Sequence, residues 1–486
     1  MSLNAALNSA QLSLSASQKR IAISASNVAG ASDPTYSRKL APLVTRDGGV
    51  YVAGPVRAGD ARLYERYLEA TSVSAREQVL LAGYTRLAET VGDTSAGKSL
   101  VGRLGALTDA LTEYANAPAD DNLARAAVTS AKDLARALND ASVAVTEVRR
   151  GAVADATASV DRINALLKDF EKANTAITQG TAGGADVTGE LDRRDAIVAQ
   201  LSEEIGVSAV TRGNGDMVLF TDGGVTLFET SAREVRLTAG LGEPVRVFVD
   251  GVQIAGDSAQ MPSKNGKLVG LVSLHNDVAS EYGKQIDTLA FGLIQTFQEL
   301  DNAGANPLPG LFTNGVSAAL PASVTPTPPD MTGWLASAIA VNVRVDPQEG
   351  GNPAHLRDGV NSVNLDGTPN AAYNRNTDGA ASFSGHLTSL LGELASPAAG
   401  LGGKTPLDYA AASVSWIESG RQASNSAAKA NDAVLQLVTT SLSNARGVDL
   451  NDETALQLEI ERMFAASAQL ISVIDNLFKN LLDAVR

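Results

Sequence analysis

The chain has 486 residues, which is enough for two to four domains. Its formal net charge of −15 argues against nucleic-acid binding, because phosphate contacts need clustered Lys and Arg. Aromatic residues make up 4% of the chain and apolar residues 44%, so we expect an aliphatic core. The absence of Cys excludes disulfides and thiolate metal sites.

The first residues do not resemble a secretory signal peptide. Residues 1–8 contain no Lys or Arg, and no continuous apolar segment follows them. No apolar run reaches the ~18 residues that a membrane span requires. We therefore expect either a cytosolic protein or one exported without cleavage of a leader.

The N-terminal segment carries a heptad pattern. Apolar and small residues recur at alternating steps of four and three, which predicts one stripe along a helix. Asn27, Gly30 and Pro34 are expected to end this helix, because Pro lacks an N–H and disfavours helical backbone before it. The residues of this N-terminal seam are Leu3, Leu7, Ala10, Leu14, Ser17, Ile21, Ser24 and Val28.

Periodic apolar residues predict further long helices after this segment. Their expected ranges are 63–91, 100–115, 123–173 and 191–205.

The middle of the chain reads differently. Residues 207–252 alternate β-branched runs with turn pairs such as Asp250-Gly251, which predicts hairpins. A helix is expected over 268–300, a linker or loop over 303–329, and irregular structure over 342–376.

The C-terminal segment repeats the heptad stepping over a wider stripe. Gly447 is expected to end the preceding helix in a left-handed conformation, and Asp449 to cap the next helix. A wide stripe could hold the N-terminal helix and still meet a neighbouring molecule. Its seam comprises Leu456, Ile460, Met463, Ser467, Leu470, Ile474, Leu477 and Leu481, with a second row at Phe464, Ile471, Phe478 and Val485.

An ordinary alternative is that both terminal helices are buried in one globule. Ser occupies three seam positions, however, and a buried hydroxyl without a partner is costly. Free chain ends also fray unless something holds them. We therefore expect the two terminal helices to become ordered on assembly.

These elements predict a mainly α fold with a β-containing insertion, in which both chain ends form a long-helix coiled-coil rod. Residues 1–35 with 449–486 would form the terminal coiled coil. Residues 36–205 with 385–448 would form the helical rod, and 206–384 a central strand-bearing region with hairpins, one helix and irregular loops.

One motif suggests a nucleotide site. Residues 92–99 match the P-loop pattern G-x-x-x-x-G-K-[ST]. A P-loop is normally fed by a strand, whereas the residues before Gly92 keep helical spacing, and Asp222, a candidate second acid, reads as part of a hairpin turn. A P-loop NTPase is therefore the alternative from another class of protein, and a turn between helices is preferred.

Other chemistry is thin. His275, His355 and His386 have no mutual metal-ligand spacing, and no Gly-x-Ser-x-Gly motif occurs. The charged run 192–195 is interpreted as i,i+3 pairs on an exposed helix face. We assign no catalytic, cofactor-binding or metal-binding residue.

Both ends resemble those of the flagellar rod, hook and hook-associated protein family. The opening signature is similar over residues 2–16 and at the turn motif, and the closing signature over 447–453 and 464–468. Residues 87–95 and 192–201, with the following hairpins, resemble the hook-associated branch. The turn motif consists of Asn27, Pro34, Tyr36, Ser37 and Arg38.

Some positions depart from that family. Gly30 stands where Asn is usual, and Asp33-Pro34-Thr35 where Thr-Pro-Gly is usual. Glu461 and Phe464 stand for the common Gln and Tyr.

The resemblance implies a structural adaptor that joins hook to filament, with no enzymatic activity and no cofactor. Its partners would be identical subunits in a ring, the hook protein, the third hook-associated protein, an export chaperone and the type III export apparatus. It would be secreted to the hook–filament junction from the cytoplasm. Flagellin, a rod protein or a hook protein are the alternatives within this class.

Overall fold

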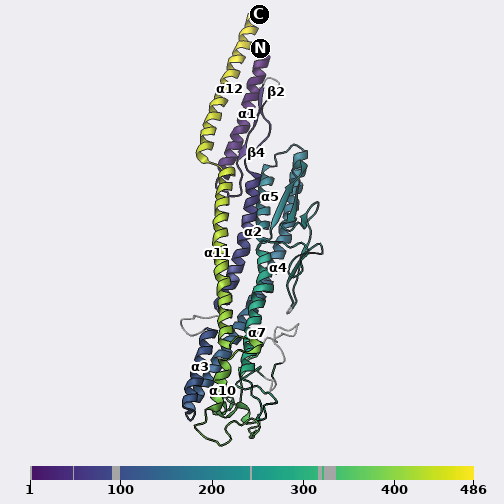
Figure 1. Ribbon diagram of the computed structural model, residues 1–486. Coiled ribbons are helices and arrows are strands. Elements are labelled where there is room, and N and C mark those ends of the chain that lie inside the picture. Colours follow the sequence, from purple (N-terminus) through teal and green to yellow (C-terminus); the bar gives the residue numbers. More distant parts are fainter. Residues whose placement is uncertain are drawn as a thin grey trace.

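The computed structural model describes residues 3–46, 49–89, 99–240, 243–315, 320–321 and 335–485. The molecule is a long rod, and both chain ends lie at the same tip (Figure 1). No helix among these residues is both long and apolar enough to cross a membrane.

The body of the rod is built from long helices. The longest has 62 residues, which corresponds to about 93 Å at 1.5 Å per residue. The helices of the body are α2 (Ala61–Glu89), α3 (Leu100–Asn116), α4 (Asp121–Ala182), α5 (Thr188–Glu204) and α11 (Pro406–Arg446). The helix α11 runs along α2, while α3 and α5 pack on α4.

Local signals set the starts of these helices. The Asp120 carboxylate accepts a hydrogen bond from Asn122 N at 2.8 Å, and Ser99 Oγ accepts one from Gly102 N at 3.0 Å. Thr405 caps α11 in the same way, with Pro406 at the first helical position. The predicted helices therefore form, with ends that differ from prediction by up to nine residues at Ala182.

Two small antiparallel sheets lie beside α4 and α5. Their strand orders are β5-β6-β7 and β10-β9-β8. Asp250 and Gly251 join β9 to β10 with φ of 47° and 82°, as a two-residue hairpin turn requires. The predicted hairpins are confirmed, and their strands are β5 (Val207–Thr211), β6 (Met217–Thr221), β7 (Thr226–Phe228), β8 (Val235–Thr238), β9 (Arg246–Val249) and β10 (Val252–Ala255).

The predicted helix over 268–300 forms in three continuous parts: α6 (Lys267–Ser273), a π-helical turn (Leu274–Ala279) and α7 (Ser280–Thr296). It packs against α2, α4 and α11, so its side chains join the core of the helical body. It ends at Thr296, and Glu299, three residues later, pairs with Leu308 in an isolated β-bridge.

The end of the rod opposite the termini is mostly irregular. It contains α10 (Gly385–Leu394) and the two-stranded pair β11 (Phe312–Thr313) and β12 (Ala340–Val341). Short helical turns are α8 (Leu335–Ala338), α9 (His355–Asp358), η2 (Gly213–Gly215, in the β5–β6 turn), η5 (Pro347–Glu349), η6 (Val360–Ser362) and η7 (Ala399–Leu401).

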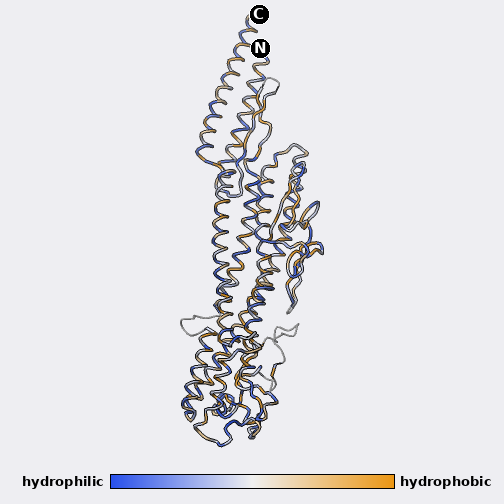
Figure 2. Tube along the Cα trace, in the orientation of Figure 1, coloured by the Kyte–Doolittle hydropathy of each residue, from blue (hydrophilic) through white to orange (hydrophobic). Residues whose placement is uncertain are grey.

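The core is continuous from α2 to α11 and largely aliphatic. The buried face of α4 alternates Ala with Leu and Val, and small residues let neighbouring helices approach closely. Hydrophilic and hydrophobic residues alternate along the long helices instead of forming one apolar band (Figure 2). The predicted fold class, mainly α with a strand-bearing region, is confirmed.

Candidate assembly interface

The two ends of the chain pair with each other. The helices α1 (Leu3–Gly30) and α12 (Leu450–Val485) lie side by side and project beyond the body at one tip (Figure 1). We refer to these two helices as the terminal pair.

On α1, the fully buried heptad positions are occupied by small residues. On α1 the buried heptad positions are Ala10, Ser17 and Ser24, whereas the large seam residues Leu3, Leu7, Leu14 and Ile21 are half-buried and Val28 is 39% exposed. The Oγ atoms of Ser13 and Ser467 are 3.0 Å apart and share a hydrogen bond. Small side chains at the contact allow the helix backbones to approach.

On α12 the predicted stripe divides into two sides. Ile460, Ser467 and Ile474 are buried against α1, while Leu456, Met463, Phe464, Ile471 and Phe478 flank them and are half-buried. Other residues of the predicted seam face away from α1 and are about half exposed. Together with neighbouring apolar residues they form what we term the exposed stripe: Leu458, Leu470, Val473, Leu477, Leu481 and Leu482.

A hairpin that the sequence analysis did not predict covers another side of α1. It pairs β2 (Leu43–Arg46) with β3 (Gly49–Val52), and a second short pair joins β1 (Lys39–Leu40) to β4 (Val56–Arg57). A Cβ atom at Gly49 would lie 2.4 Å from Leu12 Cδ1, so a larger residue there would require the Leu12 side chain to move.

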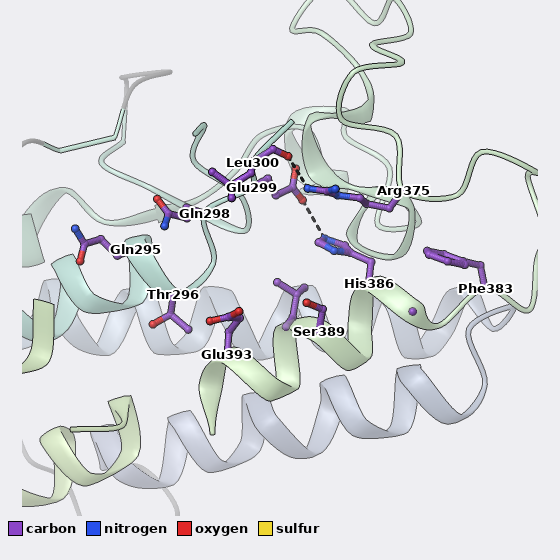
Figure 3. Close-up of a pocket in the computed structure, with 12 residues that line it drawn as sticks. Gln295, Thr296, Gln298, Glu299, Leu300, Arg375, Phe383, His386, Ser389 and Glu393 are labelled. Carbon is purple, nitrogen blue, oxygen red and sulfur yellow. Dashed lines mark hydrogen bonds and ion pairs between the residues drawn. The ribbon is translucent and has the colours of Figure 1, made fainter. Parts of the chain in front are cut away.

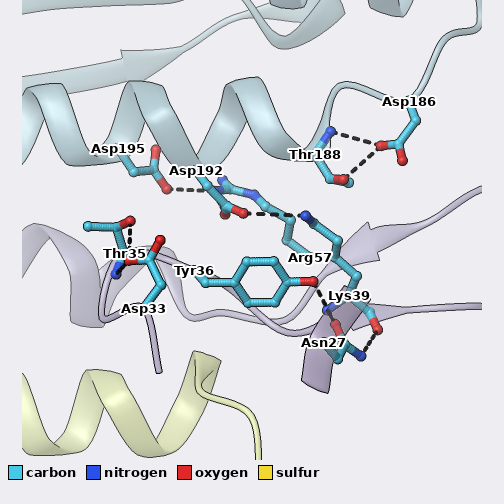
Figure 4. Close-up of polar contacts among 10 residues, drawn as sticks. All are labelled: Asn27, Asp33, Thr35, Tyr36, Lys39, Arg57, Asp186, Thr188, Asp192 and Asp195. Carbon is cyan, nitrogen blue, oxygen red and sulfur yellow. Dashed lines mark hydrogen bonds and ion pairs between the residues drawn. The ribbon is translucent and has the colours of Figure 1, made fainter. Parts of the chain in front are cut away.

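Asn27 lies at the centre of the joint between the terminal pair and the body. Its side chain is 1% exposed and forms four hydrogen bonds, of which Figure 4 shows those to Tyr36 and Lys39. Nδ2 donates to Lys39 O at 2.9 Å and to Glu453 Oε1 at 3.0 Å. Oδ1 accepts from Lys39 N at 2.8 Å and from Tyr36 Oη at 3.0 Å. One amide thus connects α1, the turn after it, and α12.

Glu453 extends this network to the body. Its carboxylate is fully buried, and its Oε2 lies 3.3 Å from Arg38 Nε. The Arg38 backbone N–H donates to Arg446 O at 2.7 Å, at the end of α11. Burial, with the charges of Asp192 and Glu453, raises the pKa of Tyr36 to about 12, so this phenol keeps its proton for the bond to Asn27.

The departures from the family turn have local explanations. A Cβ atom at Gly30 would lie 2.5 Å from the Tyr36 ring, so the ring occupies the space that a larger residue would need. Thr35 N and Oγ1 donate to Asp33 Oδ1 at 2.8 and 2.7 Å, which closes the turn without glycine.

The predicted left-handed stop at Gly447 is wrong. Gly447 is extended, with φ −71° and ψ 167°. A Cβ atom there would lie 2.4 Å from Ser443 O, so the glycine is explained by a close approach and not by its φ angle. The predicted cap at Asp449 is confirmed, because its Oδ1 accepts from Asn451 N at 2.8 Å.

The interpretation of the charged run 192–195 as an exposed face is also wrong. Only Arg193 points outward, 4.0 Å from Glu190. Arg57 Nη1 lies 3.0 Å from Asp192 Oδ1 and 2.8 Å from Asp195 Oδ2, as Figure 4 shows. The segment carrying β4 covers this face of α5, and no local pattern in the sequence reveals a partner about 135 residues away.

The P-loop match falls mostly on residues 92–98, which lie outside the described part of the chain. The segment before it is the helix α2 and not a strand. Ser99 caps α3, and Asp222 accepts hydrogen bonds from Ser263 Oγ and Lys264 N next to its hairpin turn.

The histidines lie apart and have separate partners. His386 Nε2 lies 3.1 Å from Glu299 Oε1 in a polar pocket of the irregular end (Figure 3). Burial alone would raise the pKa of Glu299, but His386 and the backbone N–H groups of Asn361 and Val360 bring it below its usual range. His275 shares a hydrogen bond with Asn276. Within the described residues, no cluster of three or more His, Asp or Glu side chains could hold a metal ion.

The described residues thus form a rod of long helices, with the chain ends paired at one tip and small strand pairs beside the helices. Residues 84–310 match the family model described as the flagellar hook-associated protein FlgK helical domain. This part of the chain is therefore similar to flagellar hook-associated proteins, which agrees with the resemblance noted in the sequence.

Among individual proteins, the chain is similar to flagellar hook-associated protein 1 of Escherichia coli strain K12. The two are 22% identical over 321 residues, which is 62% of this chain and 58% of the relative. A solved structure of the flagellar hook junction protein FlgK from Burkholderia pseudomallei aligns with a TM-score of 0.43 and 22% identity. That alignment covers 52% of this chain and 47% of the other. The chain thus matches only about half of the length of these relatives.

Proposed function

We propose that this chain is an exported structural protein of the bacterial flagellum, an adaptor at the hook–filament junction that is needed for filament assembly and catalyses no reaction. The observation that carries this proposal is the terminal pair. Only one side of α12 is covered by α1, and the exposed stripe remains at the tip of the rod. The family match of residues 84–310 supports a hook-associated protein over a flagellin, rod or hook protein.

The exposed stripe supports assembly into a ring of identical subunits. Exposed apolar residues grouped on one helix face, as Leu470, Leu477 and Leu481 are, are unfavourable in water and typical of interaction sites. In a ring, the terminal pair of one subunit lies beside that of the next, so neighbouring subunits can cover Leu470, Leu477 and Leu481. Burying each large apolar side chain contributes about 1.5–3 kcal/mol. The N-terminal seam and the α12 stripe are therefore the proposed assembly interface.

The joint would fix the angle between the terminal pair and the body of the rod. Asn27 and Glu453 are buried, Arg38 lies partly buried beside Glu453, and the Arg38 backbone N–H donates to Arg446 O at the end of α11. A tip held at a fixed angle to the body would let the body contact other flagellar parts while the tips form an inner tube. The proposed partners are the hook protein on one side and the third hook-associated protein on the other.

Before assembly, we expect a different protein to bind the exposed stripe and shield it from water. A flagellar export chaperone would bind α12 in the cytoplasm as an amphipathic helix in a groove. The type III export apparatus would then carry the chain to the outside. We expect no cofactor, nucleic acid or membrane insertion to be involved.

The proposal is tested by deleting the gene and examining the cells by negative-stain electron microscopy. We expect hooks without filaments, flagellin shed into the medium, and recovery of filaments when the intact gene is returned. Normal filaments in the deletion strain would exclude this function.

A further inference from the structure

A cavity of about 360 Å³ opens next to the joint, between the start of α2, the helix α5, the strand β5 and the end of α11. Its walls are mainly apolar, with Leu68, Leu191, Met217 and Leu442 among the lining residues. Arg194, on α5, also lines the cavity.

Arg194 is unusually poorly paired for a buried cation. Its side chain is 2% exposed, and both of its hydrogen bonds use Nη1, to Asn174 Oδ1 and to Gly215 O. Its Nε is buried without an acceptor. A guanidinium has five N–H donors, and a buried charge is costly unless it is paired and hydrogen-bonded.

The carboxylates around the cavity either have partners other than Arg194 or lie exposed at the rim. Asp195 is bound by Arg57, and Asp60 caps α2 by accepting from Arg62 N and Leu63 N. Glu65, also in the cavity wall, is exposed. Within the described part of the chain, Arg194 therefore forms no ion pair, and burial lowers its pKa.

An apolar cavity with an unpaired guanidinium suits a carboxylate side chain flanked by an apolar one, because charge-assisted bonds to arginine are the strong ones. A second copy of this chain can supply this combination. The chain has 54 Asp and Glu against 39 Lys and Arg. Leu458 and Glu461, both exposed and three residues apart on one face of α12, are an example.

We propose that the cavity beside Arg194 receives an acidic side chain and its apolar neighbour from a second copy of this chain. Arg446, whose carbonyl accepts from Arg38 N in the joint, also lines the cavity, so this contact continues the proposed ring interface. The contact joins two different surface patches of the chain. Such heterologous contacts form a closed ring when the rotation from one subunit to the next divides evenly into a full turn. This inference rests on the proposed function, which places identical subunits side by side.

The rim of the cavity allows a matched photo-crosslinking test in assembled flagella. Thr211 lines the cavity, whereas Val210, the preceding residue of β5, is 51% exposed and points to the opposite face of the strand. A photoreactive residue, Thr211→p-benzoylphenylalanine, should capture a second copy of the chain on illumination of isolated flagella. Val210→p-benzoylphenylalanine is the control and should not.

The role of the guanidinium is tested by adding Arg194→Gln to the Thr211 variant. We expect the captured dimer to fall roughly tenfold, as for the loss of one strong charged contact. Arg194→Lys, which keeps the cation, should retain most of the capture, and this distinguishes lost charge from misfolding if the Gln variant melts early.

Incorporation of both photoreactive variants without a dimer, equal capture from positions 210 and 211, or capture of a different protein would each overturn the inference and leave the proposed function standing. Absence of the chain from the flagella of cells that grow filaments would refute the proposed function, and the inference with it.

Discussion

Single polar side chains decide how the terminal pair is attached to the rod. Asn27 uses both atoms of its amide, and its partners come from α1's own turn and from α12, 426 residues away in sequence. The hydrogen bonds of the buried Asn27 amide can all form only when α12 lies in one position relative to α1. They therefore favour that position over others. The serines at the contact, by comparison, leave Ser24 Oγ without an acceptor.

We predict that Asn27→Ala weakens the junction without affecting the helical body. The change leaves Glu453 Oε1, Lys39 N and Tyr36 Oη without this partner, and each unsatisfied buried group costs about 1–3 kcal/mol. The temperature at which filaments detach from hooks, scored by electron microscopy, should fall. The melting temperature of the purified chain should stay the same. Asn8→Ala, at an exposed position of α1, is the control; equal detachment temperatures for both variants would contradict the assigned role.

Asp287 gives the stability of the body a dependence on pH. Its carboxylate is 1% exposed and accepts a hydrogen bond from Ala336 N at 2.7 Å. Burial raises its pKa from 3.8 to about 7, against the lowering effect of backbone donors. An acid whose pKa is higher in the folded state stabilises the fold fully below the unfolded pKa, and this contribution is lost as pH rises through about 7.

We therefore predict that Asp287→Asn reduces the loss of stability between pH 5 and pH 8. Each unit of pKa difference corresponds to about 1.4 kcal/mol, so the two proteins should diverge measurably in urea-unfolding midpoint. Asp140→Asn, an exposed change on α4, should keep the pH dependence of the unchanged protein. Parallel pH profiles for Asp287→Asn and the unchanged chain would count against this explanation.

Among the elements, α12 differs from the helices of the body because its apolar residues cover two sides. Its buried side faces α1 through Ile460, Ser467 and Ile474. The exposed stripe faces solvent in the single chain. A helix with this distribution is suited to one intramolecular and one intermolecular contact.

We predict that Leu477→Asp and Phe478→Asp both block ring assembly and weaken chaperone binding. Leu477 is 47% exposed, and Phe478 is half-buried beside α1. A carboxylate at either position would have to be buried when another protein covers α12, and burying an unpaired charge is costly. The melting temperature of the body should not change, because the main core contains no residue of α12. Calorimetric titration against the chaperone, a thermal melt and electron microscopy measure the three effects.

The control is Asn476→Asp, which adds the same charge to an exposed polar position next to Leu477. It should bind the chaperone and assemble normally. A lower melting temperature with unchanged chaperone affinity would place α12 in the core of the single chain, contrary to this account.

At the scale of the whole molecule, the rod consists of a thick body and a thin tip. The main core runs from Leu68 to Ile417 and contains no residue of α1. The terminal pair is supported by its own contact, the β2–β3 hairpin and the joint. Stability is therefore concentrated in the body, and the tip can open by itself.

We predict that hydrogen exchange of the purified monomer is fast up to about residue 32 and beyond about residue 449. Residues 63–89 and 99–173 should be strongly protected, because α2, α3 and α4 share the continuous core. In isolated flagella the same terminal residues should become protected. Equal protection of tip and body in a verified monomer would show that the ends are ordered without assembly.

The long helices, the hairpins after Val207 and the heptads of both ends could be predicted from the sequence, because each depends on residues within a few positions of one another. Apolar spacing, Asp449 as a cap and Asp250-Gly251 as a turn act locally. The sequence also showed that α12 has more apolar surface than one helix covers. It could not show which of its residues face α1.

The tertiary structure alone decided which polar residues are buried. Asp192 and Arg194 looked like part of a solvated helix face, but β4 and the β5–β6 turn cover them. Asn27 and Glu453 meet only because α1 and α12 fold back to the same tip. Asp192 pairs with Arg57, 135 residues away, and Asn27 with Glu453, 426 residues away, and no local spacing encodes such partners. The joint and the cavity beside Arg194 were therefore determined by the packing of distant segments.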